Sequence, residues 1–420
     1  MMTQKPLPPP VPPQESQQTF YGLGIAPKIL DIIERIGFKV PTPIQLKAIP
    51  MALEGKDIVG IAQTGTGKTH AFAVPMVQRL AQEKKTMGLV LAPTRELAIQ
   101  ISEAYQPLVR AFGMNTACLI GGAPMEPQNE ALRNDPRIVI ATPGRLLDHM
   151  RQWHIVLNEV VVLVLDEADR MLDMGFAPQI EMILRYTKRE RQTMLFSATI
   201  PKEIMAIASR HMKLPISVEV APSGTAAEKV THELFIVKRE MKFNLLDKLL
   251  KQRYHGPVLL FSRTKHNARK IARMLRDKRY RAAEIHSDRS LPQRREALEG
   301  FKSGRYKVLV ATDVASRGID VTGIELVINY DLPEDAENYV HRIGRTGRAG
   351  QKGHAISFAT PDQKRDVADI EKLIRFSLPV SKHPEVPTEE FSKAEAPLGP
   401  RHRPAKRPFG HGQRPFRRHR

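Results

Sequence analysis

Short runs of consecutive apolar residues, each followed by polar or glycine-containing residues, recur along the first half of the chain. They are Gly88–Ala92, Ile138–Ala141, Val160–Leu165 and Met194–Phe196. Strands that are apolar along their whole length are buried on both faces, which is typical of a parallel sheet with helices on both sides. The pattern therefore predicts an α/β domain in which the polar strand ends gather at one edge of the sheet.

A second series of apolar runs follows a stretch of small and polar residues. Its members are Val258–Phe261, Ala282–Ile285, Val308–Ala311, Leu326–Asn329 and Ala355–Phe358. We therefore expect two tandem α/β domains, each a mostly parallel sheet with helices on both faces. The expected organisation is a Pro-rich disordered arm (1–18), the first domain (19–217), a linker (218–229), the second domain (230–378) and a basic disordered tail (379–420).

The stretch I-V-G-I-A-Q-T-G-T-G-K-T, from Ile58 to Thr69, runs from an apolar strand into a Gly-Lys-Thr turn. Glycines let the backbone approach phosphates, Lys68 would reach the β and γ oxygens, and the Thr69 hydroxyl would bind Mg²⁺. The general phosphate-loop pattern has glycine where this chain has Ala62. A glycine-rich turn with a surface lysine is the structural alternative.

Two acidic residues, Asp166 and Glu167, come directly after the apolar run Val160–Leu165. Buried carboxylates are costly unless they meet a cation, so the pattern predicts a magnesium site. Asp166 would hold the ion opposite Thr69, and Glu167 would orient or deprotonate the attacking water. An acidic helix cap is the structural alternative.

Two further patterns favour a nucleotide. Gln45 lies just after Pro41 and Pro43, which would fix its amide either to read an adenine edge or simply to begin a helix. Arg342, Arg345 and Arg348 are spaced by three, so like charges lie close together. A γ-phosphate brought across an interdomain cleft would satisfy them, and a patch that contacts RNA phosphates is the alternative.

The charge balance points to a polyanionic partner. The chain of 420 residues has 65 Lys and Arg against 45 Asp and Glu, a formal charge of +20. Residues 399–420 carry seven arginines and one lysine without any acid, interleaved with Phe409 and Phe416, as in RNA-binding segments that combine phosphate contacts with base stacking. A solvated tail without function is the alternative. The single Cys118 and the lack of an apolar run near ~20 residues favour a soluble cytoplasmic protein.

Seven motifs occur in a fixed order: A-Q-T-G-T-G-K-T, P-T-R-E-L-A, T-P-G-R, D-E-A-D, S-A-T, A-T-D-V-A-S-R-G-I-D and H-R-I-G-R-T-G-R. In this order they resemble the DEAD-box RNA helicases of superfamily 2, most closely the bacterial RhlE group, over about Phe20 to Leu378. The resemblance implies two RecA-like domains and RNA-stimulated ATP hydrolysis coupled to local, non-processive unwinding or RNP remodelling. An ATP-gated RNA clamp or assembly scaffold is one alternative, and a DNA-translocating motor is another.

The resemblance also implies roles for individual residues. Those expected to hold ATP and Mg²⁺ are Phe20, Gln45, Thr64, Gly65, Thr66, Gly67, Lys68, Thr69, Asp166, Asp320, Arg345 and Arg348. Those expected to contact the RNA backbone are Pro93, Thr94, Arg95, Gly122, Thr142, Arg145, Arg263, Thr312 and Gly318. Ser197, Thr199, His341 and Arg342 would couple hydrolysis to RNA release. The implied partner is RNA bound with low sequence specificity, by a monomer, with ribosome-assembly or RNA-decay partners left open.

Overall fold

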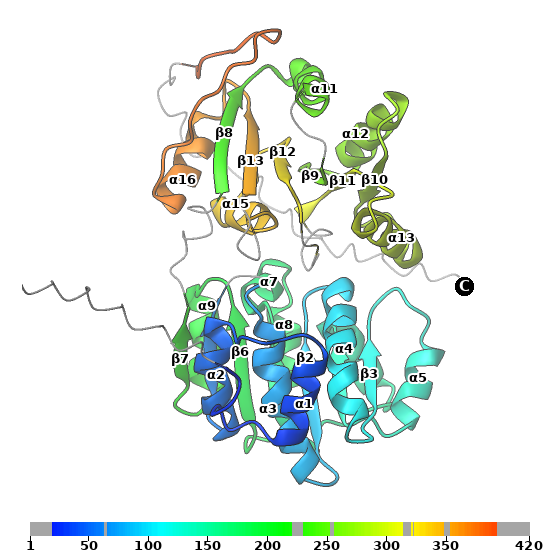
Figure 1. Cartoon of the computed structure of the whole chain (residues 1–420). Coiled ribbons are helices and arrows are strands. Elements are labelled where there is room, and N and C mark those ends of the chain that lie inside the picture. The colour runs from blue at the N-terminus through cyan, green and yellow to red at the C-terminus, as the bar shows by residue number, and fades with distance from the viewer. Residues whose placement is uncertain are drawn as a thin grey trace, which may run out of the picture.

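The chain forms two α/β domains, in agreement with the predicted fold class (Figure 1). The structure is a computed structural model, and it describes residues 19–62, 65–220, 230–252, 256–313, 321, 323–347 and 353–392. The Pro-rich arm, Thr64, Gly318, Asp320, Arg348 and the segment 399–420 lie outside these ranges. Within them, no helix combines the length and apolar character that crossing a bilayer requires.

The first domain is built on a seven-stranded sheet in the order β3-β4-β2-β5-β6-β1-β7, with every pair parallel. Its strands are β1 (Ile58–Ile61), β2 (Met87–Leu91), β3 (Thr116–Leu119), β4 (Ile138–Ala141), β5 (Val160–Leu165), β6 (Gln192–Ser197) and β7 (Ile216–Glu219). The run of six apolar residues forms β5, the central strand. Val162 and Val164 pack into one core and Leu163 and Leu165 into the other, so β5 is buried on both faces as predicted.

Helices cover both faces of this sheet. On one face lie α1 (Pro27–Arg35), α2 (Pro43–Leu53), α3 (Lys68–Gln82) and α4 (Arg95–Arg110). On the other lie α5 (Glu126–Arg133), α6 (Pro143–Arg151), α7 (Ala168–Asp173), α8 (Ala177–Tyr186) and α9 (Lys202–His211). The helices α3, α4, α6 and α7 each follow the carboxyl end of a strand, which places their N-termini at the edge where ligands are expected.

The second domain has a six-stranded parallel sheet in the order β10-β11-β9-β12-β13-β8. The strands are β8 (Val230–Ile236), β9 (Val258–Phe261), β10 (Ala282–Ile285), β11 (Val308–Ala311), β12 (Leu326–Asn329) and β13 (Gly353–Ala359). One face carries α11 (Lys242–Gln252), preceded by the 3-10 turn η1 (Arg239–Met241), and α12 (Lys265–Asp277). The other carries α13 (Leu291–Lys302), α15 (Ala336–Ile343) and α16 (Lys364–Ile374).

The apolar runs did not predict three of the strands, β3, β7 and β8, and all three lie at the edge of a sheet. Edge strands have fewer neighbours and tolerate polar residues, so they lack the continuous apolar run of a central strand. One domain boundary shifts as a result. Val218 and Glu219 pair with β1 as part of β7, so the linker predicted at 218–229 begins too early. Residues 221–229 lie outside the described ranges.

The predicted start of the disordered tail is also wrong. Residues 379–392 run along β8, where the Leu234 amide donates to the Pro379 carbonyl at 2.9 Å and the Ser381 amide donates to the Leu234 carbonyl at 2.8 Å. Val386 is buried in the core beneath α11. This segment satisfies backbone groups that the edge strand would otherwise expose, so the second domain extends at least to residue 392.

Candidate active site

The phosphate loop has the backbone geometry that its sequence predicts. Gly65 and Gly67 have φ values of +85° and +89°, a region in which residues with a Cβ are strained. Gly67 is also the N-cap of α3, and a Cβ at this position would lie 2.7 Å from the Gln45 amide nitrogen. Backbone conformation and space therefore both require glycine at position 67. The N-terminus of α3 follows the end of β1, as in a phosphate-binding loop.

Gln45 supports this loop from α2. Its Oε1 accepts from the Thr42 amide at 2.9 Å, which caps the helix, and its Nε2 donates to the Gly67 carbonyl at 3.0 Å. Both amide atoms are thus engaged within the protein, which joins the proposed adenine reader to the phosphate loop. Phe20, the residue expected to stack on the base, is buried in the first domain's core. Base recognition by these two residues stays a prediction.

Lys68 is the clearest sign of an anion site. The side chain is only 6% exposed, and its Nζ finds no hydrogen-bond partner among the residues that the structure describes. A buried ammonium without an acceptor is unfavourable, and a phosphate oxygen would satisfy it. Thr69, the next residue, is half-buried at the start of α3. The pair therefore fits the phosphate and magnesium roles assigned to it.

The acidic pair lies at the end of β5, beside Lys68. Asp166 and Glu167 are both buried, and the Glu167 amide donates to Asp166 Oδ1 at 3.0 Å. Burial raises the pKa of Asp166 to about 6, although the Lys68 charge acts in the opposite direction. A divalent cation would hold this carboxylate ionised, so the donor set fits Mg²⁺. Glu167 is the N-cap of α7 with φ +49°, a left-handed conformation that aims its side chain differently from that of Asp166.

Asp169, which sequence reasoning had not singled out, connects these acids to Ser197 and Thr199. Its Oδ2 accepts from the Thr199 amide at 2.9 Å and from the Thr199 hydroxyl at 3.1 Å, and its own amide donates to Ser197 Oγ at 3.2 Å. Burial acts to raise the pKa of Asp169, but His341, Lys68 and two backbone hydrogen bonds together lower it. Ser197 and Thr199, which are expected to couple hydrolysis to RNA release, are therefore tied to the D-E-A-D segment.

A small cavity brings side chains of both domains together. The first domain contributes Lys68, Glu167, Asp169, Arg170 and Ala198, and the second contributes His341 and Arg345. Burial lowers the pKa of His341, although Asp169 and Glu167 oppose this shift, so the imidazole is favoured in its neutral form. The structure thus places Arg345 and His341 beside the phosphate loop, across the domain boundary.

Arg170 is a second residue that the sequence patterns missed. It is 4% exposed, and all three of its guanidinium nitrogens lack a hydrogen-bond partner within the described part of the chain. Burial lowers its pKa to about 10. With Lys68 and Arg345 it places three cations beside the carboxylates of Glu167 and Asp169 in this cavity. D-E-A-D followed by arginine offered no separate sequence signal.

Arg342 does not join this cluster. Its guanidinium donates to both Asp313 oxygens at 2.6 and 2.7 Å, to Asn329 Oδ1 at 3.1 Å and to the Asp331 carbonyl at 2.6 Å. It is 1% exposed and lies 5.0 Å from the centre of the Phe261 ring. The hypothesis of three arginines on one phosphate is therefore wrong for Arg342, which joins the strand ends of the second domain.

The residues predicted to contact RNA gather at neighbouring strand ends. In the first domain they follow β3, β4 and β2, which are adjacent in the sheet. A side chain at Gly122 would collide with the Arg95 guanidinium, and Arg145 donates to the Ala123 carbonyl at 3.1 Å. Thr94 caps α4 through the Leu97 amide, and Pro93 and Thr142 lie beside it on the same edge.

In the second domain, Arg263 and Thr312 follow the adjacent strands β9 and β11. The Arg263 side chain is exposed and donates to the Leu332 carbonyl at 3.3 Å, and Thr312 is buried. Both positions lie at the predicted edge, and RNA contact by these residues stays a prediction.

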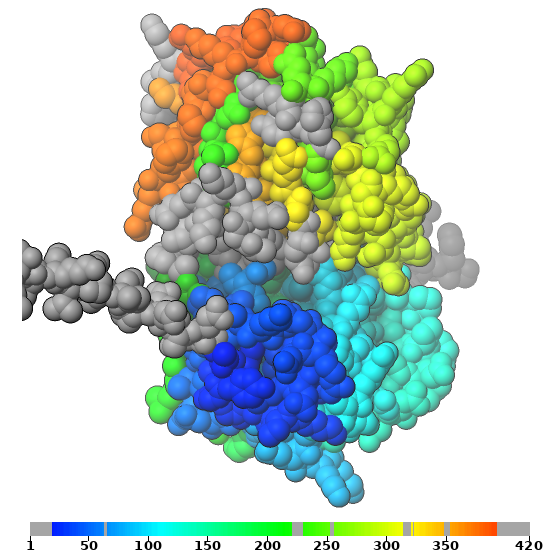
Figure 2. All heavy atoms as spheres, in the orientation of Figure 1, coloured from blue at the N-terminus to red at the C-terminus, as the bar shows by residue number. Residues whose placement is uncertain are grey.

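One buried ion pair links the domains at this edge. Arg294 of α13 donates to Glu96 of the P-T-R-E-L-A segment at 2.8 Å, and both side chains are at most 10% exposed. Figure 2 shows the yellow-green surface of the second domain, which includes α13, against the cyan surface of the first. The pair lies 198 residues apart in sequence, and no local pattern pointed to it.

Comparisons with known proteins agree with this geometry. Residues 42–207 match the family model of the DEAD/DEAH box helicases, and residues 241–350 match that of the helicase conserved C-terminal domain. A DEAD-box ATP-dependent RNA helicase of Geobacillus kaustophilus, CshA, is 42% identical over 87% of this chain and 79% of its own length. RhpA of Helicobacter pylori, with the same description, is 40% identical over 89% of this chain and 76% of its own length.

A solved structure shows a similar arrangement of both domains. It is that of Saccharomyces cerevisiae Dbp5 bound to RNA and ADP BeF3, which is 30% identical, with a TM-score of 0.79 over 87% of this chain and 95% of Dbp5.

Proposed function

This chain belongs to the DEAD-box family of ATP-dependent RNA helicases, and we propose that its two domains close on ATP and single-stranded RNA to separate short duplexes locally. One observation carries the proposal. Lys68 and Glu167 of the first domain share a cavity with His341 and Arg345 of the second. A site divided between two domains is complete only when they close, so hydrolysis depends on the closed state.

Lys68, Arg170 and Arg345 would bind the phosphate chain of ATP, because these cations line the same cavity. Thr69 and Asp166 would hold Mg²⁺, which when bound neutralises phosphate charge and stabilises the leaving group. Glu167 would orient the attacking water and accept its proton. Arg348 and Asp320 are proposed for the γ-phosphate and the ribose on the family resemblance.

The coupling path would run from the acids to the RNA edge. Asp169 accepts hydrogen bonds from Thr199, and it shares its cavity with His341 of the other domain. Loss of the γ-phosphate would change the electrostatic balance among these groups and favour domain opening. The proposed output is release of one RNA strand on closure and of the other after hydrolysis.

The RNA would lie along the strand ends that carry Arg95, Arg145 and Arg263. These cations act on phosphates, so sequence specificity should be low and affinity should fall with salt. The similarity to Dbp5, whose structure contains RNA and ADP BeF3, supports this placement. The compact core and basic tail also lead us to propose that the chain belongs to the bacterial RhlE group. We propose in addition that the protein is a cytoplasmic monomer with partners in ribosome assembly or RNA decay.

The decisive experiment measures ATP hydrolysis and single-turnover strand release by the full chain. We expect RNA, and not DNA of the same sequence, to stimulate hydrolysis, and a short RNA duplex to separate within one ATP-dependent encounter. Lys68→Ala serves as the control, because it removes the buried ammonium while leaving the RNA edge intact. Hydrolysis stimulated equally by DNA would contradict the RNA assignment. Long-lived ATP-dependent RNA binding without strand release would favour the clamp or scaffold alternative.

A further inference from the structure

The second domain carries a dense cluster of basic residues between Arg263 and Arg289. This stretch contains ten Lys and Arg residues and three acidic residues, a net charge of +7 within a chain of +20. Half of the ten belong to α12, whose apolar side chains Ala268, Ile271, Ala272 and Leu275 are buried against the sheet. The opposite face of α12 is therefore an exposed cationic surface.

Basic residues of α12 form a row. His266, Lys270, Arg273 and Arg276 recur every three or four residues and are all exposed, so they lie on one side of the helix. With Arg269 and Arg289 they line a groove of about 460 Å³ that also contains Glu284 of the edge strand β10. We call this feature the α12 groove.

Few acids neutralise the α12 groove. Glu284 is buried, accepts from Arg289 and lies 3.9 Å from Arg276, and Asp288 lies 3.5 Å from Arg269. Lys270 and Arg273 form no ion pair with any residue in the described ranges. Like charges at helical spacing repel one another, so a bound polyanion would reduce the electrostatic repulsion among these side chains.

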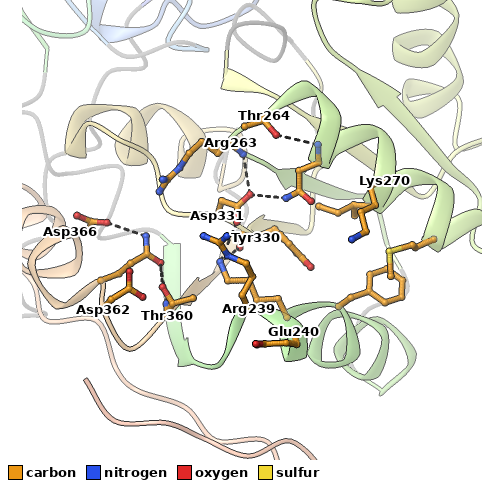
Figure 3. Close-up of a pocket in the computed structure, with 16 residues that line it drawn as sticks. Arg239, Glu240, Arg263, Thr264, Lys270, Tyr330, Asp331, Thr360, Asp362 and Asp366 are labelled. Atoms are coloured by element: carbon orange, nitrogen blue, oxygen red, sulfur yellow. Dashed lines mark hydrogen bonds and ion pairs between the residues drawn. The ribbon is translucent and has the colours of Figure 1, made fainter. Parts of the chain in front are cut away.

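The α12 groove is continuous with the proposed RNA edge. Arg263 and Lys270 both line a cavity of about 790 Å³ at the carboxyl edge of the second sheet (Figure 3). Its own charges are mixed, because Asp331 accepts from Asn267 and pairs with Lys242, so this cavity is not a simple anion site. Lys270 lines the cavity and the groove alike, and so connects Arg263 to the cations farther along α12.

We infer that the α12 groove binds the sugar–phosphate backbone of RNA that extends past Arg263, outside the single-stranded segment in the interdomain cleft. From His266 to Arg276 the helix rises about 15 Å at ~1.5 Å per residue. In a nucleic-acid duplex each strand presents a phosphate about every 3.4 Å along the helix axis, the value for double-stranded DNA, so a duplex arm laid along α12 would offer about four phosphates of one strand over this length. This regular spacing, and the continuity with Arg263, favour RNA over an acidic protein. The inference rests on the proposed function.

The test compares two triple variants of the full chain. One neutralises the groove with Lys270→Gln, Arg273→Gln and Arg276→Gln, since glutamine keeps helix propensity. The control removes the same charge from the exposed face of α16, on the opposite face of the sheet, with Lys364→Gln, Arg365→Gln and Lys372→Gln. Each protein is titrated with a short single-stranded RNA that fills only the cleft, and with the same strand extended by a duplex arm at either end.

For the extended RNA, the slope of log affinity against log salt should become shallower by about 2 to 3 in the groove variant, at ~0.7 to 0.9 per lost contact. The α16 variant should match the wild type, and the short RNA should bind and stimulate ATP hydrolysis equally in all three proteins. An unchanged slope with the extended RNA would overturn the inference. So would binding of a polyglutamate peptide that the groove variant alone loses, combined with unchanged RNA affinity. A wild type that does not respond to the short RNA would contradict the proposed function instead.

Discussion

Breaking the ion pair between Glu96 and Arg294 should weaken domain closure while leaving each domain folded. In the closed arrangement both side chains are buried and Arg294 donates to one Glu96 oxygen at 2.8 Å. In an open form both charges would return to water. The penalty for leaving one charge buried and unpaired therefore falls almost entirely on the closed state.

The magnitude follows from the geometry of this pair. Truncating one partner of a buried, hydrogen-bonded ion pair costs about 2 to 5 kcal/mol. Here Glu96 Oε1 and Arg294 Nε have no hydrogen-bond partner in the described part of the chain, so the contact is a single hydrogen bond rather than a bidentate pair. We therefore expect the lower part of that range, about 2 to 3 kcal/mol, or a ~30- to 150-fold shift of the closure equilibrium.

The assay is the RNA concentration that gives half-maximal ATP hydrolysis, since hydrolysis requires closure. Glu96→Gln and Arg294→Met should each raise this concentration by about 30-fold or more. The free-energy cost of closure in the double variant should be smaller than the sum of the costs in the two single variants. Glu126→Gln is the matched control, because Glu126 forms an exposed ion pair with Arg133 inside the first domain. Single variants within twofold of the wild type, with intact folding, would refute the reasoning.

Four further changes test other parts of the site. Glu167→Gln should bind ATP and RNA but hydrolyse slowly, about 10²-fold or more below the wild type in single turnover, because Asp166 and Lys68 survive while the water loses its base; near-normal turnover would remove Glu167 from this role. Gln45→Ala should erode the preference for ATP over GTP in competition binding, whereas equal weakening of both nucleotides would mean that the amide acts only through the Gly67 carbonyl. Deleting residues 399–420, which carry eight positive charges, should make the salt slope for RNA binding shallower by roughly 3 if about half of them meet phosphates, with ATP hydrolysis retained at saturating RNA; an unaltered slope would show the tail to be a bystander. Arg342→Met should destabilise the second domain by about 3 to 5 kcal/mol in denaturant unfolding, because it removes the buried guanidinium that bonds Asp313, Asn329 and the Asp331 carbonyl; an unchanged unfolding midpoint would contradict that anchoring role.

Local sequence patterns explain why these candidate site residues could be chosen in advance. The glycines of the phosphate loop, the lysine after them and the acids at the end of β5 each stand out by residue type within a short stretch of the chain. Their backbone conformations depend on residue type, as the left-handed φ of Gly67 illustrates. The apolar runs likewise specified the central strands, because only a strand buried on both faces needs an uninterrupted run.

The edge strands and the domain boundaries were harder to predict from the sequence. β7 and β8 are outermost strands of their sheets and tolerate polar residues, so their pattern does not differ from that of a connector. Residues 379–392 are polar and proline-containing, as a disordered tail would be. They are ordered because the unpaired edge of β8 accepts their backbone hydrogen bonds, which is a property of the assembled sheet.

The sequence alone therefore indicated which residues are candidates for the chemistry, and the tertiary structure decided which of them meet. Arg342 and Arg345 have the same spacing signal, yet the first is satisfied by Asp313 inside its own domain and the second reaches the cavity with Lys68. Gln45 contacts Gly67 from 22 residues away, and Arg294 contacts Glu96 from 198. Such partners depend on the order of the strands and on the closing of two domains, and neither leaves a trace in the spacing of residues along the chain.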